Sequence, residues 1–106
     1  MIVGNISVFY MDDIYKENGR LAYFLDEKYW GRGLMTTAIK KYCEYVFSEN
    51  EIIQRIFADP FESNIGSRKV LEKCGFSLEG ILRNNVIKNG IRQSSYLYSL
   101  LRDEIK

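Results

Sequence analysis

Tyr29-Trp30-Gly31-Arg32-Gly33-Leu34-Met35-Thr36-Thr37-Ala38 joins a short apolar run, Leu21–Leu25, to the start of a helical pattern. Glycine lets the backbone adopt positive φ and approach a ligand closely. The first N–H groups of a helix have no partner inside the helix, and the helix dipole places partial positive charge there. A strand, a glycine turn and a helix start are together typical of a phosphate site. The pattern therefore predicts a phosphate-bearing cofactor on residues 31–36.

Two glycines between a strand and a helix are equally typical of a tight connection that binds nothing. The stretch is not a nucleotide P-loop, because no Gly-Lys-Ser/Thr follows a glycine at the required spacing. It is not the dinucleotide fingerprint either, because the third glycine is missing. The spacing alone leaves both interpretations open.

The composition is that of one small globular domain. Of 106 residues, 46% are hydrophobic and 27% are charged, which argues against disorder. A net charge of +1 gives no field that would recruit nucleic acid or a membrane surface, and no apolar run is long enough to span a bilayer. We expect a cytoplasmic protein, because no signal peptide is evident and Cys43 and Cys74 fit free thiols. The absence of histidine excludes a serine–histidine triad and argues against a zinc site.

Hydrophobic periodicity in the first half of the chain predicts two strands, a helix and a third strand. Residues 2–10 and 20–25 are predicted strands, joined by a polar hairpin loop over 11–19. Residues 34–48 carry apolar side chains at helical spacing, and Asn50 marks the expected end of this helix. Residues 52–58 are a predicted buried strand, which the following proline ends because it lacks the N–H that a strand ladder needs.

The second half of the chain predicts a helix and a hairpin. The helix runs from Ser63 or Asn64, either of which supplies an N-cap oxygen, to Cys74, with Gly75 at the left-handed position after it. An apolar segment starts at Phe76, and Asn89-Gly90 is a hairpin turn before a run from 91 to 101. The order strand-strand-helix-strand-helix-strand-strand predicts an α/β fold. It is a mixed, mostly antiparallel sheet flanked by two helices, in a single domain over residues 1–106.

Several segments, in this order and spacing, point to one family. They are Gly4–Ser7, Tyr29–Gly33, Asn64-x-x-Ser67, and Val70–Phe76 followed by Glu79-Gly80. Together they resemble the GNAT N-acetyltransferases, and most of all the branch that acetylates the N-terminal alanine of ribosomal proteins. The resemblance covers residues 2–102.

The resemblance implies that acetyl-CoA is the acetyl donor and that no metal takes part. Its pyrophosphate would lie on the backbone N–H groups of residues 31–36. The strand carrying residues 23–25 would splay from the 52–58 strand, and the pantetheine arm would pair with the free edge. The implied cofactor-binding residues are Phe24, Leu25, Trp30, Gly31, Arg32, Gly33, Leu34, Met35, Thr36, Asn64 and Ser67.

Ser67 is the catalytic candidate that the resemblance offers. Backbone N–H groups near Leu25 would polarise the thioester carbonyl, and Ser67 or a water would protonate the leaving thiolate. Many relatives use a tyrosine for this step, but Leu71 stands at its place here and cannot donate. Apart from the resemblance, the residues favour a simple N-cap for Asn64 and a solvated helix residue for Ser67. The general base is left open, and the carboxylates nearest the expected site are Glu51, Asp59 and Glu62.

The expected reaction transfers an acetyl group to a primary amine, such as a protein N-terminus. Two alternatives stay open: a small-molecule acceptor such as a polyamine or an antibiotic, and a non-catalytic acyl-CoA-binding or assembly module. The second arises because relatives carry a strand and a pair of helices, and usually another strand, before the segment that matches Ile2. Without them the strand at Ile2 would present an open edge, which predicts a homodimer or higher homo-oligomer.

Overall fold

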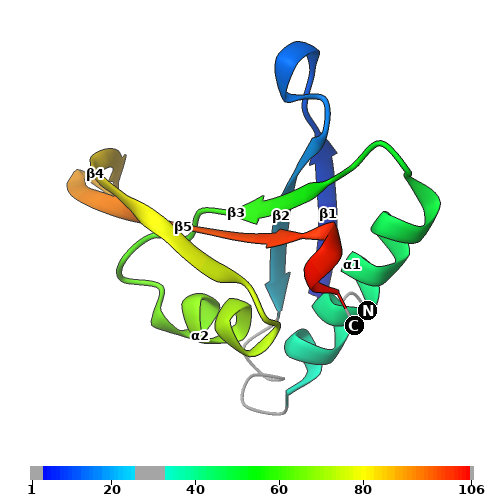
Figure 1. Ribbon diagram of the computed structural model, residues 1–106. Helices are drawn as coiled ribbons and strands as arrows, with labels where there is room; N and C mark the ends of the chain where they lie inside the picture. The colour runs from blue at the N-terminus through cyan, green and yellow to red at the C-terminus, as the bar shows by residue number, and fades with distance from the viewer. Residues whose placement is uncertain (1–3, 26–32, 106) are drawn as a thin grey trace.

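The computed structural model describes residues 4–25 and 33–105, which form one five-stranded sheet with two helices (Figure 1). The strand order across the sheet is β1-β2-β3-β5-β4. The strands are β1 (Gly4–Tyr10), β2 (Asn18–Leu25), β3 (Arg55–Ala58), β4 (Ser77–Lys88) and β5 (Ile91–Leu101). The helices are α1 (Leu34–Glu49) and α2 (Ile65–Lys73), with short 3-10 turns η1 (Asp13–Tyr15) and η3 (Arg102–Glu104).

The sheet is mixed, as predicted. β2 and β3 pair in parallel, and α1 lies in the connection between them, as a parallel pair requires. The other neighbours, β1–β2, β3–β5 and β4–β5, are antiparallel. The predicted fold class and order of elements are therefore confirmed. In the described part of the chain, no helix is long and apolar enough to cross a membrane.

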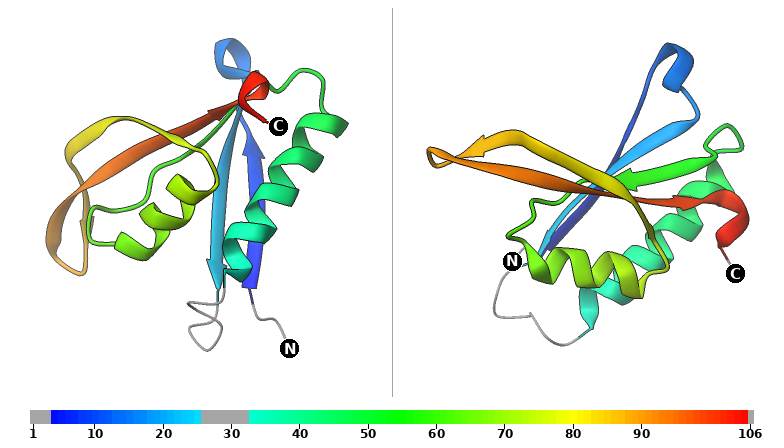
Figure 2. Two further views of the ribbon diagram at one scale, coloured as in Figure 1. Left: turned by 60° about the horizontal axis from the view of Figure 1, so that its bottom comes forward. Right: turned by 60° about the vertical axis from the view of Figure 1, so that its left-hand side comes forward.

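The core lies between one face of the sheet and both helices (Figure 2). Alternate strand positions face the helices, and Leu21, Ile56 and Leu100 from three strands are almost fully buried there. They meet Ile39 of α1 and Leu71 of α2, which are both 0% exposed. This packing brings the two helices into contact beside the sheet.

Local signals predicted the helix ends and one turn correctly. Asn50 is the C-cap of α1, and Asn64 is the N-cap of α2. Gly75 has φ of 91°, the left-handed conformation expected after a helix. Asn89 and Gly90 both have positive φ, as a two-residue hairpin turn of type I′ requires.

Two predicted strand boundaries and the predicted burial of one cysteine were wrong. Asn18 and Gly19 belong to β2 and not to the hairpin loop, since Gly19 pairs with Tyr10 in the β1–β2 ladder. A Cβ added to Gly19 would lie 2.6 Å from Val8 Cγ1, so a larger residue there would displace this methyl group. The third strand begins at Arg55, so Ile52 precedes it and is 63% exposed. Cys74 follows α2 as its C-cap and is only half-buried, whereas Cys43 is fully buried on α1.

Candidate functional site

β2 and β3 separate after a short parallel ladder. Only Asn18, Gly19 and Arg20 of β2 pair with β3, opposite Arg55, Ile56 and Phe57. Residues 21–25 continue to pair with β1 but have no partner on the β3 side among the described residues. Figure 2 (left) shows the two strands diverging, with α2 beside the gap. Every second backbone N–H and C=O of residues 21–25 therefore points away from β1 toward this gap.

The N-terminus of α1 lies beyond the end of β2. Its N-cap is Gly33, which has φ of 69° and makes no side-chain cap, and the first turn contains no acidic residue. The N–H groups of Leu34, Met35 and Thr36 precede the first helical hydrogen bond, which Thr37 donates to the Gly33 carbonyl at 3.2 Å. Gly33 and Leu34 are exposed, and a Cβ added to Gly33 meets no described atom within 4 Å.

Within the described residues this helix start has the properties of an anion site: N–H donors outside the helical hydrogen-bond ladder, the positive end of the helix dipole, and room for a ligand to approach the backbone. The donors therefore fit the pyrophosphate of coenzyme A. Trp30, Gly31 and Arg32 lie outside the described residues. Of the two predicted β2 residues, Phe24 is 54% exposed, and Leu25 is the last residue of the strand.

Asn64 and Ser67 hold the start of α2 together. Asn64 Oδ1 accepts a hydrogen bond from the Ser67 N–H at 3.1 Å, so the N-cap interpretation of Asn64 is confirmed. The cap uses only the oxygen of the side-chain amide. The Nδ2 group is a further donor on an exposed residue at the gap.

Tyr23 was not predicted as a site residue, yet its side chain joins the unpaired half of β2 to α2. The Tyr23 hydroxyl donates to the Ser67 carbonyl oxygen at 3.2 Å and is also hydrogen-bonded to Ser67 Oγ. Burial raises the pKa of Tyr23 to about 12, so the phenol is protonated at neutral pH. Strand alternation places Tyr23 on the same face as Leu21, but only tertiary structure brings it to Ser67.

The three candidate carboxylates differ in their surroundings. Asp59 Oδ1 accepts from Arg20 Nη2 at 2.9 Å and from Nε at 3.1 Å, at the point where β2 and β3 part. Glu62 Oε1 accepts from the Ser94 N–H at 3.0 Å. Both lie between β3 and α2 in the chain.

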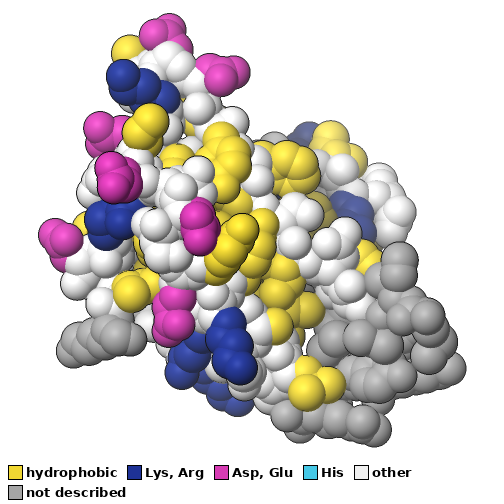
Figure 3. All heavy atoms as spheres, turned by 90° about the vertical axis from the view of Figure 1, so that its right-hand side faces the viewer, with side chains coloured by type: hydrophobic (Ala, Val, Ile, Leu, Met, Phe, Trp, Pro, Cys, Tyr) yellow, Lys and Arg dark blue, Asp and Glu magenta, His cyan; other side chains and the backbone are white. Residues whose placement is uncertain are grey.

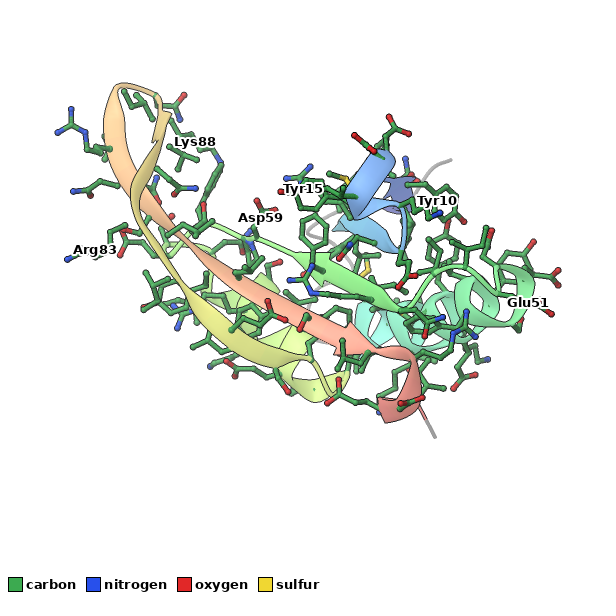
Figure 4. All side chains as sticks on the ribbon, turned by 45° about the horizontal axis from the view of Figure 1, so that its top comes forward. Tyr10, Tyr15, Glu51, Asp59, Arg83 and Lys88 are labelled. Carbon is green, nitrogen blue, oxygen red and sulfur yellow. The ribbon has the colours of Figure 1, made fainter. Side chains whose placement is uncertain are left out.

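Glu51 was wrongly placed near the site. It follows the C-terminal end of α1, in a separate hollow that Tyr10 and Lys16 also line. The 16 residues of α1 span about 24 Å, which puts Glu51 at the opposite end of the helix from Gly33. Figure 4 shows Glu51 at this end and Asp59 beside β3, well apart.

The two thiols and Leu71 are not placed for proton transfer or attack. Leu71 is 0% exposed and belongs to the core. Burial raises the pKa of Cys43 to about 12 and also raises the pKa of Cys74, so both are thiols at neutral pH. Cys74 Sγ contacts the Thr36 carbonyl at 3.4 Å and so links the end of α2 to the first turn of α1.

One face of the molecule carries charged side chains of both signs. On the face shown in Figure 3, acidic and basic side chains both occur, with hydrophobic side chains between them. Within the described residues, no three His, Cys, Asp or Glu side chains are grouped as metal ligands.

Comparison with known proteins identifies the family to which this fold belongs. Residues 1–77 match the acetyltransferase (GNAT) domain. The chain belongs to the GNAT acetyltransferase family. The chain is 35% identical over 103 residues to YjcK of Bacillus subtilis, described as a probable N-acetyltransferase, with 97% of this chain and 56% of that protein covered.

Two solved GNAT structures have the same fold. The ribosomal-protein-S5-alanine acetyltransferase from Vibrio fischeri superposes with a TM-score of 0.86 at 29% identity, covering 98% of this chain and 56% of that one. The microcin C7 self-immunity acetyltransferase MccE, in complex with acetyl-CoA and AMP, gives 0.75 at 28% identity, covering 84% and 49%. This GNAT chain thus spans about half the length of the relatives that it matches.

Proposed function

We propose that this GNAT domain binds acetyl-CoA and transfers its acetyl group to a primary amine. The observation that carries the proposal is the gap between β2 and β3, beside which Tyr23 of β2 contacts Ser67 of α2. Acetyl-CoA supplies an activated thioester. The chain must bind the pyrophosphate and the pantetheine arm, polarise the thioester carbonyl and assist proton transfer. Phe24, Leu25 and residues 30–36, with Asn64 and Ser67, are the proposed binding residues.

The chain meets these requirements with backbone and hydroxyl groups. N–H groups at the α1 start would neutralise the pyrophosphate, and the unpaired edge of residues 21–25 would pair with the amides of the pantetheine arm. The same edge offers N–H donors to the thioester oxygen, which develops negative charge during attack. Asn64 Nδ2 would donate to a pantetheine carbonyl while its oxygen keeps the cap. We propose that Ser67 donates a hydrogen bond to the leaving sulfur and that Asp59 or Glu62 accepts a proton from the amine.

A protein N-terminus is the acceptor that we favour. The support is the likeness to an enzyme whose name specifies an alanine of a ribosomal protein. A small-molecule amine is the alternative acceptor. A non-catalytic acyl-CoA-binding module is the alternative function, because Leu71 stands where many relatives carry a tyrosine.

Thiol release separates these possibilities. The protein is mixed with acetyl-CoA and either peptides that begin with alanine or a panel of polyamines and aminoglycosides, and free thiol is followed. Faster release with the alanine peptides supports the favoured acceptor. Binding of coenzyme A without release on any amine supports the non-catalytic module, and absence of binding overturns both.

We also propose that the protein acts in the cytoplasm as a homo-oligomer, without nucleic acid or membrane partners. β1 is the last strand of the sheet order and pairs only with β2 among the described residues, so its outer edge is available to another strand. Static light scattering tests the proposed oligomeric state, and a monomeric mass at micromolar concentration contradicts it.

A further inference from the structure

Tyr23 and Ser67 form a hydrogen-bonded pair across the gap where the thioester is proposed to lie. Tyr23 comes from the half of β2 that has left β3, and Ser67 comes from the first turn of α2. The tyrosine hydroxyl lies 3.2 Å from the Ser67 carbonyl and within hydrogen-bond distance of Ser67 Oγ. The Tyr23 hydroxyl can therefore determine which acceptor receives the hydrogen bond from the Ser67 hydroxyl.

The pair has two hydrogens and two arrangements. Each hydroxyl carries one proton and can also accept. In the first arrangement Tyr23 donates to the Ser67 carbonyl, and Ser67 Oγ donates to Tyr23. In the second, Tyr23 donates to Ser67 Oγ, and the Ser67 proton is released for another acceptor. Only the two hydroxyl protons rotate between these arrangements, so the backbone and rings need not move.

We propose that Tyr23 is a positioning residue for acetyl transfer: by donating to Ser67 Oγ, it directs the Ser67 proton to the sulfur of coenzyme A. The inference rests on the proposed function and adds a residue to it. A hydroxyl that accepts one hydrogen bond becomes a stronger donor in the next, by about 10–30% per bond. Tyr23 thus both orients Ser67 and strengthens its donation.

The surroundings of Tyr23 keep its proton available. The ring packs against the core, and burial keeps the phenol protonated across the neutral range. Cys74 and Tyr98 are the other titratable groups that act on it, and both disfavour the phenolate. The pair therefore stabilises negative charge on sulfur by hydrogen bonding and loses no proton itself.

The chemical step balances without a proton from the pair. The amine nitrogen forms a bond to the thioester carbon, the carbon–sulfur bond breaks, and its electron pair leaves on sulfur. The amine gives up one proton to a base or solvent, and the thiolate takes one from solvent. Tyr23 and Ser67 lower the energy of the thiolate while it forms.

The pKa of the coenzyme A thiol, bound to the protein, measures this effect without any acetyl transfer. Thiolate absorbance in the ultraviolet is titrated against pH for the wild-type protein and for Tyr23→Phe, Ser67→Ala and the double variant. Without Ser67, we expect the bound thiol pKa to rise by about one unit, since a hydrogen bond to a charged group is lost. Tyr23→Phe should raise it by about half a unit, because Ser67 remains but is no longer directed. The double variant should equal Ser67→Ala.

The Tyr23→Phe substitution keeps the aromatic ring, so its packing against the core should be preserved. An unchanged circular dichroism spectrum would check that the variant is folded. Tyr15→Phe removes a hydroxyl from an exposed tyrosine in the η1 turn and should leave the bound thiol pKa unchanged. A bound thiol pKa in Tyr23→Phe equal to that of the wild type overturns the inference alone. Additive effects in the double variant also overturn it. Failure of the wild type to bind coenzyme A overturns the proposed function and, with it, the inference.

Discussion

Replacing Gly33 with glutamate should strongly weaken anion binding at the start of α1 while leaving the fold nearly intact. Gly33 has φ of 69°, and a Cβ there meets no described atom within 4 Å. The cost to folding is therefore the left-handed backbone, about 1–2 kcal/mol for a residue with a side chain. A carboxylate at the positive end of the helix offsets about 0.3–1 kcal/mol of this. We expect the free energy of unfolding to fall by about 1 kcal/mol.

Binding should respond far more strongly. A carboxylate about 5 Å from one phosphate charge, at an effective dielectric constant of about 20, costs about 3 kcal/mol. That energy corresponds to roughly a hundredfold weaker Kd for coenzyme A. The loss should shrink as salt is added, because the groups are at the surface.

Calorimetric titration with coenzyme A measures the change in affinity, and urea unfolding measures the change in stability. Gly90→Glu is the matched control, since Gly90 also has positive φ (78°) and space around it but lies in the β4–β5 turn. It should show the same backbone strain and normal binding. Unchanged affinity in Gly33→Glu would refute the phosphate site, and equal losses in both variants would show that folding alone is responsible.

Three further variants test the remaining structural claims. Asn64→Asp keeps the capping oxygen but loses the Nδ2 donor, so α2 should stay stable while coenzyme A binds about tenfold more weakly by calorimetry; equal binding refutes the donor role. Arg102 donates to the carbonyls of Phe47, Asn50 and Ile53, so Arg102→Met should cost about 3 kcal/mol in urea unfolding and Arg102→Lys less, with exposed Arg92→Met as a near-silent control; a cost below about 1 kcal/mol contradicts this. Arg55 and Ser99 lower the pKa of Glu79, so the stabilisation is present above the ordinary glutamate pKa and is lost as pH falls through the lowered value. Glu79→Gln should therefore reduce stability at pH 7 by about 1 kcal/mol or less, since the carboxylate is partly exposed, and should match the wild type near pH 2; a constant difference across this range refutes the linkage.

Local chemistry made several features readable from the sequence. The apolar spacing of residues 34–48 predicted α1 to within one residue of its observed end, Glu49. Asn89-Gly90 predicted the hairpin because few other residues accept positive φ at both positions. The order of strands and helices predicted a mixed sheet. Each of these signals depends on neighbours within a few positions of the chain.

Signals that depend on distant residues were misread or missed. Asn18-Gly19 has the composition of a turn, but Gly19 pairs with Tyr10 in the β1–β2 ladder and lies against Val8. Ile52 has strand propensity but lies in a loop, where the backbone turns from α1 into β3. Glu51 is near Asp59 in sequence, yet a helix of about 24 Å separates it from the start of α1.

The glycine turn and the family pattern were thus determined by the sequence alone, because backbone conformation and helix ends follow from local residue types. The tertiary structure decided which groups meet in the gap. β2 leaves β3 after Arg20, α2 packs beside the opening, and Tyr23 reaches Ser67 across 44 positions of chain. Packing of the core between sheet and helices sets that meeting, and no local spacing encodes it.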